Sequence, residues 1–118
     1  MSPERLFRLL ADHTRLRCLS LLRAEQSLCV CELTHALDLS QPKISRHLAM
    51  LREGGLVMDE RRGQWVHYQL AGDLPDWVRA IIDASVEAQR QSGQIGRDSL
   101  RLKAMVGRPS PDLCADDH

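Results

Sequence analysis

The apolar pattern changes at Gly54-Gly55, and this change limits the fold more than any other feature of the sequence. Before the glycine pair, apolar residues recur at helical spacing between Ile44 and Leu51. Ser40 is suited to cap this helix, and Pro42 lies in its first turn. The pattern therefore predicts a helix that begins near Ser40 and ends at the glycines.

Beyond the glycine pair, polar and apolar residues alternate as they do in a strand with one buried face. Residues 56–61 predict one strand and residues 64–70 predict a second, with Gly63 permitting the turn between them. A short amphipathic helix is also predicted at residues 33–37, and residues 38–40 separate it from the helix that follows. Two short helices joined by such a turn, with a hairpin after them, are typical of a winged helix-turn-helix.

The remaining segments are mostly helical in pattern. Residues 6–10 and 16–22 predict two N-terminal helices, and Pro75 begins a later helix whose apolar stripe lacks a partner in the winged unit. We expect this helix to form a dimer contact with the first helix. The prediction is a mainly α fold with a small β-hairpin wing, dimeric through its N- and C-terminal helices. Residues 1–92 form the domain, and residues 93–118 form a C-terminal tail, partly helical or disordered.

Length and composition set broad limits on the chain. Its 118 residues fit one domain, and a domain of this size buries a modest fraction of its surface, so dimerisation would help. Aromatic residues make up only 3%, so the core must be aliphatic. Neither an apolar run of about 18 residues nor an apolar signal core is present, which predicts a cytoplasmic protein with no membrane partner. In that compartment its four cysteines stay reduced.

Basic and polar residues without any acid occupy the segment from Gln41 to Met50. The formal net charge is zero, so the distribution of charge, and not its total, argues for nucleic acid. Gln can pair with adenine and Arg or Lys with guanine, while a basic wing tip suits phosphate or the minor groove. The predicted DNA contacts are Gln41, Lys43, Ser45, Arg46 and His47 in the helix and Arg61, Arg62 and Gln64 at the wing. A dimer would read half-sites roughly 34–36 Å apart, which predicts a palindromic operator on double-stranded DNA.

Cys29 and Cys31 form a Cys-x-Cys motif just before this DNA-reading segment, and such a pair can hold a soft ion. If both belonged to a regular helix, their side chains would point about 200° apart. One ion would then bind both sulfurs only by distorting the first turn of that helix, which would change the aim of the next helix on DNA. Cys18 lies on an apolar helix face and is expected to be a small core residue.

The segments Leu28-Cys29-Val30-Cys31-Glu32-Leu33 and Ser40-Gln41-Pro42-Lys43-Ile44-Ser45-Arg46-His47-Leu48 closely resemble the ArsR/SmtB family of metal-responsive repressors, in particular its arsenic-responsive members. The resemblance runs from about Leu6 to Val86 and includes Trp65-Val66-His67-Tyr68. It implies a homodimer that represses its own operon, needs no cofactor for DNA binding and performs no catalysis. It also implies release from DNA when As(III) or Sb(III) binds as inducer.

The family pattern places a third thiol three residues after the second, and here that residue is Thr34. The resemblance therefore carries over only Cys29 and Cys31 as metal ligands. The third position stays open between water, a small thiol, Cys114 and Cys18.

Three other functions remain open from the sequence. Cys31 and His35 share a helix face and, with Cys29, could suit zinc or cadmium. However, the cysteine-bearing N-terminal extension of cadmium sensors and the last-helix histidine of zinc sensors are both missing, which favours arsenic. The cysteine pair could alternatively form a thiol-redox switch, and the winged helix could bind protein instead of DNA.

Overall fold

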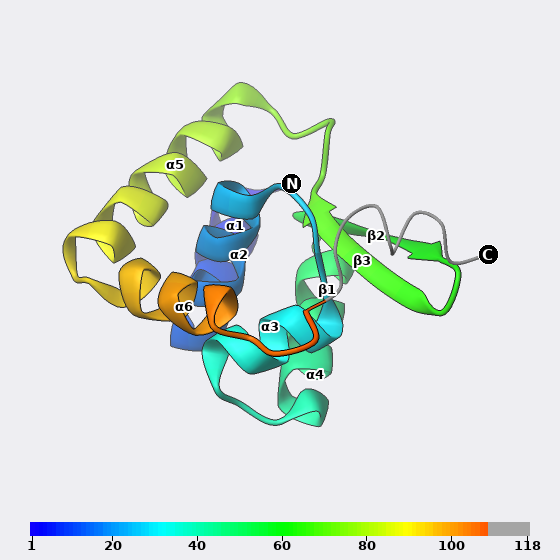
Figure 1. Cartoon of the computed structure of the whole chain (residues 1–118). Coiled ribbons are helices and arrows are strands. Elements are labelled where there is room, and N and C mark those ends of the chain that lie inside the picture. The colour runs from blue at the N-terminus through cyan, green and yellow to red at the C-terminus, as the bar shows by residue number, and fades with distance from the viewer. Residues whose placement is uncertain (109–118) are drawn as a thin grey trace.

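The structure is a computed structural model that describes residues 1–108, in which six helices and three strands follow one another (Figure 1). The elements are α1 (Pro3–Leu10), α2 (His13–Glu25), β1 (Leu28–Cys29), α3 (Val30–Leu37), α4 (Gln41–Glu53), β2 (Val57–Arg62), β3 (Trp65–Leu70), α5 (Asp76–Gln91) and α6 (Gln94–Lys103). This confirms the predicted winged helix-turn-helix, mainly helical with a small antiparallel sheet. Within residues 1–108, no helix combines the length and apolarity needed to cross a membrane.

The two helices of the helix-turn-helix, α3 and α4, begin and end at residues suited to those positions. Asp38 ends α3 in the left-handed conformation, with φ of 55°. The Ser40 hydroxyl accepts a hydrogen bond from the Lys43 amide at 3.4 Å and caps α4, as predicted. At the other end of α4, a Cβ on Gly54 would lie 2.3 Å from Cδ1 of Leu9, so this glycine allows α4 to approach the N-terminal helix closely.

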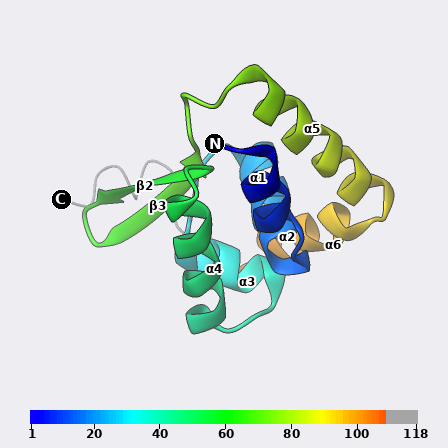
Figure 2. The same cartoon turned by 180° about the vertical axis from the view of Figure 1, so that it is seen from behind.

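The wing is a hairpin with a third, very short strand beside it. β2 and β3 pair antiparallel from Val57 opposite Leu70 to Arg62 opposite Trp65, which leaves Gly63 and Gln64 as the turn. Figures 1 and 2 show the hairpin projecting from the helical body. β1 pairs with the other edge of β3, so the strand order is β1-β3-β2. A strand of two residues is too short to show alternation, and for this reason the sequence did not predict it.

The core is aliphatic and centred on α2. This helix packs against each of the other five described helices and against β3. Its buried Leu19, Leu21 and Leu22 lie among leucines from α1, α3 and α4. Cys18 is fully buried in the same cluster, which confirms its predicted core role, and burial raises the pKa of its thiol to about 12.

The first part of the segment predicted as a partly helical or disordered tail forms α6, which packs on the body, and the boundary at residue 92 stays a prediction. α6 packs against α2, α3 and α5. Its Asp98 is 1% exposed and accepts hydrogen bonds from Arg17 Nε at 3.0 Å and Nη2 at 2.8 Å. Arg101 donates to Asp98 at 2.6 Å and to the Ala36 carbonyl at 2.7 Å. These contacts are polar, so the weak apolar pattern of α6 did not reveal them.

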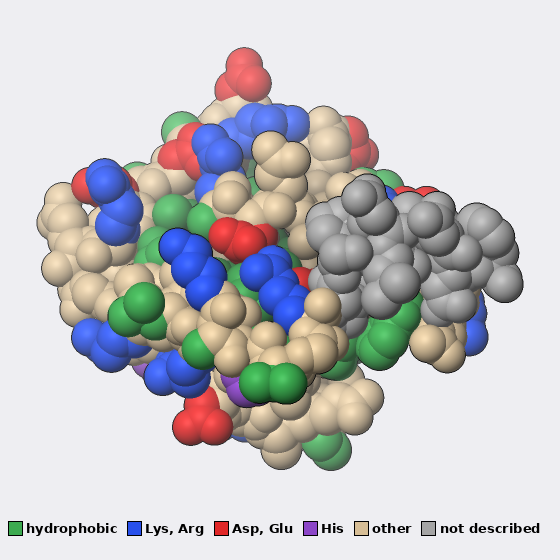
Figure 3. Space-filling view, in the orientation of Figure 1, with side chains coloured by type: hydrophobic (Ala, Val, Ile, Leu, Met, Phe, Trp, Pro, Cys, Tyr) green, Lys and Arg blue, Asp and Glu red, His purple; other side chains and the backbone are tan. Residues whose placement is uncertain are grey.

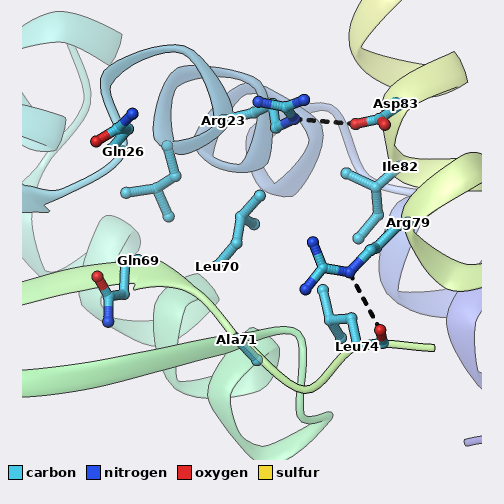
Figure 4. A pocket seen from close by; sticks show the side chains of 10 residues that line it. Arg23, Gln26, Gln69, Leu70, Ala71, Leu74, Arg79, Ile82 and Asp83 are labelled. Carbon is cyan, nitrogen blue, oxygen red and sulfur yellow. Dashed lines mark hydrogen bonds and ion pairs between the residues drawn. The ribbon is translucent and has the colours of Figure 1, made fainter. Parts of the chain in front are cut away.

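Polar contacts also join α5 to the body, around a hollow of about 300 Å³ (Figure 4). Arg23 of α2 pairs with Asp83 of α5 at 3.0 Å. Arg79 donates to the Leu74 carbonyl at 3.2 Å and to the Gly72 carbonyl at 2.9 Å, which holds the loop that leads into α5. Within one chain α5 packs on α2, and its predicted role in a dimer stays a prediction.

Candidate functional site

The outward face of α4 carries four of the five residues predicted to reach DNA from this helix. Gln41, Lys43, Ser45 and Arg46 are exposed, whereas Ile44 on the opposite face is buried. α4 is therefore held by its apolar face with its polar face open to solvent, as a recognition helix requires. That these four side chains contact DNA stays a prediction.

His47, the fifth residue, faces the interior and does not fit its predicted role. It is 6% exposed, and its Nδ1 lies 3.3 Å from Nη1 of Arg15 and 3.8 Å from Oδ1 of Asp12. Arg15 in turn donates to the carbonyls of Leu9 at 2.7 Å and Arg8 at 3.1 Å. Burial lowers the pKa of His47, although Asp12 opposes this shift.

The spacing of α4 could have revealed this orientation. Position 47 lies with positions 44, 48 and 51 on one helical face, and all four are buried. The imidazole thus belongs to a polar contact beneath the recognition helix.

The predicted residues of the wing tip differ in their exposure to solvent. Arg61 and Gln64 are exposed at the end of the hairpin, and Arg61 Nε donates to the Gly63 carbonyl at 3.0 Å. Arg62 is half-buried and pairs with Glu60 at 3.4 Å. Arg61 and Gln64 are thus the tip residues best placed for a phosphate or groove contact.

The two cysteine sulfurs lie side by side at the start of α3, with Sγ atoms 2.7 Å apart. Cys29 is the N-cap, with extended φ and ψ of −83° and 164°, and Cys31 is the second residue of the helix. The expectation that a regular helix holds the two sulfurs apart is therefore wrong, because Cys29 precedes the helix. One ion can reach both sulfurs without unwinding α3.

The surroundings of the pair favour the protonated thiol at Cys29. Burial raises the pKa of this thiol, and the hydrogen bond with Cys31 raises it further. The Cys29 amide donates to the carboxylate of Glu32 at 2.9 Å, as in a capping box. Sequence reasoning missed the role of Glu32, although its place three residues after the N-cap was the available signal.

The cysteines open into a hollow of about 600 Å³, here called the cysteine hollow. It is lined by Cys29, Val30, Cys31, Thr34, His35, Gln41, Gln64, Trp65, Val66 and Met105. The start of the recognition helix and the tip of the wing therefore share one cavity with the cysteine pair. Such sharing joins the predicted ion site to both predicted DNA-reading elements.

Within residues 1–108, no third cysteine lines the cysteine hollow. Thr34 lines the cysteine hollow, and its buried hydroxyl has no hydrogen-bond partner within residues 1–108. Cys18 is in the core, and Cys114 lies outside the described residues. In the described part of the chain no three or more His, Cys, Asp or Glu side chains form a metal-binding group. Cys29, Cys31 and the exposed His35 thus do not form the three-ligand set considered for zinc or cadmium.

Charges on the face that carries α5, α6 and α3 are mixed. Figure 3 shows acidic and basic side chains interspersed over this face. This face therefore does not carry a surface potential of a single sign, which is consistent with the zero formal net charge of the chain.

Comparisons with known proteins agree with this arrangement. A family profile described as "Bacterial regulatory protein, arsR family" matches residues 12–59, from α2 into β2. The chain is 53% identical over 116 residues to "Arsenic resistance transcriptional regulator ArsR1" of Pseudomonas putida, covering 98% of this chain and 89% of that protein. It is 51% identical over 113 residues to "Arsenical resistance operon repressor" of Escherichia coli, covering 96% of each.

A solved structure shows the same fold. HlyU from Vibrio cholerae matches with a TM-score of 0.62 and 35% sequence identity, covering 75% of this chain and 88% of that chain. Sequence similarity to the arsenic regulators extends over nearly the whole chain, through the cysteine pair, α4 and the wing. The chain belongs to the arsR family of bacterial regulatory proteins.

Proposed function

We propose that this chain is an arsenic resistance repressor that binds a palindromic operator as a homodimer. As(III) or Sb(III) binds Cys29 and Cys31 and releases the repressor from DNA. The observation that carries this proposal is the cysteine hollow, which is shared by the sulfur pair, Gln41 of α4 and Gln64 of the wing. The relatives are transcriptional regulators and not enzymes.

The chemistry of trivalent arsenic suits the cysteine pair. It is a soft centre that prefers thiolate sulfur, and two sulfurs at one helix start can both reach it. Each thiol condenses with one As–OH group, so that an S–As bond forms and one water molecule leaves. Two such steps consume no net proton, which fits a Cys29 thiol whose pKa burial raises. The third position takes a hydroxide or a small thiol, since the Thr34 hydroxyl is a poor soft donor.

Release follows from a change in the spacing of the two sulfurs. An ion bound to both sulfurs would replace the hydrogen bond that now joins the two thiols and would set their separation through its own bonds. Cys29 belongs to the wing sheet and Cys31 to α3, so a new separation of the sulfurs moves the helix-turn-helix relative to the wing. The ion then favours a state with altered DNA contacts, which is the differential affinity that release requires.

A titration on DNA tests this function. Fluorescence anisotropy of DNA from upstream of the gene, with arsenite, antimonite, cadmium and zinc added in turn, should show release by arsenite and antimonite. The C29S/C31S variant should bind the same DNA and stay bound with arsenite, and C18S should behave as the wild type. Arsenite release of the double variant, or release by cadmium and zinc alone, would contradict the proposal.

A thiol-redox switch is the second candidate, and the short distance between the two sulfurs favours it. Hydrogen peroxide would oxidise both thiols to one disulfide and be reduced to two water molecules. This candidate predicts quantitative disulfide formation together with DNA release under mild peroxide, and no response to arsenite. Mass spectrometry of the peroxide-treated protein, in parallel with the same anisotropy assay, separates it from the metalloid response.

A further inference from the structure

The chain returns to the cysteine pair after α6. Met105 lines the cysteine hollow, and Arg108, three residues later, reaches across to α3. Nε of Arg108 lies 2.6 Å from Oε2 of Glu32, and its Nη2 lies 3.2 Å from Oε1 of Glu25. An arginine from the end of the described chain thus pairs with the helix that begins at the cysteines.

Glu32 is the residue through which this contact reaches Cys29. It is 4% exposed, and each of its carboxylate oxygens has a partner. Oε1 accepts the Cys29 amide hydrogen bond at 2.9 Å, and Oε2 pairs with Arg108. A continuous path of contacts therefore runs from Arg108 through one carboxylate to the backbone of Cys29.

Arg108 keeps this buried carboxylate in place. A buried charge that loses its partner is strongly unfavourable, so Glu32 without Arg108 would turn toward water. The Cys29 amide would then lose its acceptor, and the N-terminus of α3 would lose its capping box. The sulfur of Cys29 would no longer be held at a fixed place relative to Cys31.

We propose that Arg108 is a positioning residue for metalloid binding, acting through Glu32 on Cys29. It pre-organises the cysteine pair so that both sulfurs meet one ion. This inference rests on the proposed function of Cys29 and Cys31 as metalloid ligands. Arg108 makes no bond to the ion, and it is not expected to affect DNA affinity in the absence of the ion.

Arsenite affinity of the full chain tests the proposal. The dissociation constant is measured from the ultraviolet absorption of the As–S bonds in the reduced protein. R108A should bind arsenite about 10- to 100-fold more weakly, the usual range for residues that orient a ligand from outside the site. The arsenite affinity of R108K should lie between the affinities of R108A and the wild type. Lysine keeps the positive charge, but it lacks the planar guanidinium whose two nitrogens contact Glu32 and Glu25. K103A removes an exposed positive charge from the end of α6 and should match the wild type.

A charge-neutral rescue separates positioning from general structural damage. The E32Q change keeps an oxygen for the Cys29 amide and removes the need for a cation. E32Q/R108A should therefore recover most of the affinity lost in R108A, and E25Q should have little effect. DNA affinity without arsenite should be equal in all variants. If R108A fails to bind DNA, the arsenite affinities of R108K and E32Q/R108A are compared with that of the wild type instead.

The remaining outcomes are equally informative. Unchanged arsenite affinity in R108A, an equal loss in K103A, or a loss that E32Q does not relieve would each overturn the role of Arg108. Failure of the wild type and K103A to bind arsenite would instead overturn the proposed function.

Discussion

Cys29 is paired with His67 across β1 and β3, so the first sulfur of the cysteine pair belongs to the same sheet as the wing. Cys31, two residues later, belongs to α3 and moves with the helix-turn-helix. The pair therefore spans the junction between the two parts of the protein that are predicted to contact DNA. An ion that changes the spacing of the two sulfurs acts directly on this junction.

Arg46 is exposed on the outward face of α4, and R46A should weaken operator binding without changing stability. The loss of one base or phosphate contact should cost about 1–3 kcal/mol. Anisotropy titrations at several salt concentrations measure it, with K103A as the control for loss of one positive charge. A smaller slope of log affinity against log salt concentration in R46A would show that Arg46 contacts a phosphate. An unchanged slope with weaker binding would show that it contacts a base edge. Wild-type affinity in R46A would contradict the predicted role of α4.

The buried His47 should make stability depend on pH. Burial lowers its pKa below the ordinary 6.5, so the folded state favours the neutral imidazole that accepts from Arg15. A lowered histidine pKa gives a stabilisation that is complete above about pH 6.5 and is lost as the pH falls through the folded pKa. H47Q should be less stable at neutral pH and should lose less stability than the wild type between neutral and mildly acidic pH.

Urea denaturation at a series of pH values measures this difference. H35Q is the matched control, because His35 is an exposed histidine on α3 and its replacement should leave the pH dependence of stability as in the wild type. Parallel pH curves for H47Q and the wild type would show that His47 does not carry the effect.

The sequence predicted the helix-turn-helix, the hairpin and the cysteine pair, because each depends on local signals. Ser40 and the glycine pair set the limits of α4, and Cys-x-Cys is a motif of three adjacent residues. The orientation of His47 and the packing of α6 depend on partners far along the chain, such as Arg15 and Asp98. A buried imidazole or carboxylate is stabilised by partners that no local pattern identifies.

The side-by-side cysteine sulfurs show the same limit in a different way. The expected separation of the two sulfurs holds only if both residues belong to one regular helix, whereas pairing of Leu28 and Cys29 with β3 keeps Cys29 just outside α3. Because Cys29 lies one residue before α3, the two sulfurs lie close together and do not point to opposite sides of a helix. Helix limits are the part of a sequence-based prediction that is least well determined.

Removal of Asp98 from its ion pair with Arg17 and Arg101 should strongly destabilise the fold. D98A would leave the buried guanidinium of Arg17 without its carboxylate, which typically costs about 3–5 kcal/mol. D83A removes the exposed partner of Arg23 and should cost only about 0–1 kcal/mol. Urea denaturation of both variants compares the two sites, and equal losses would argue that α6 is not an integral part of the fold.

Trp65 lines the cysteine hollow and should report metalloid binding through its fluorescence. The chain has two tryptophans, so W77F leaves Trp65 as the single tryptophan, whose emission is selected by excitation at wavelengths that tyrosine does not absorb. A metalloid bound to the cysteine pair would occupy the hollow that the indole lines, and arsenite should therefore shift or quench the emission in proportion to occupancy. The titration curve should match the arsenite dependence of DNA release measured by anisotropy. C29S/C31S in the W77F background should show no change, and a change that persists there would place the responsive site elsewhere.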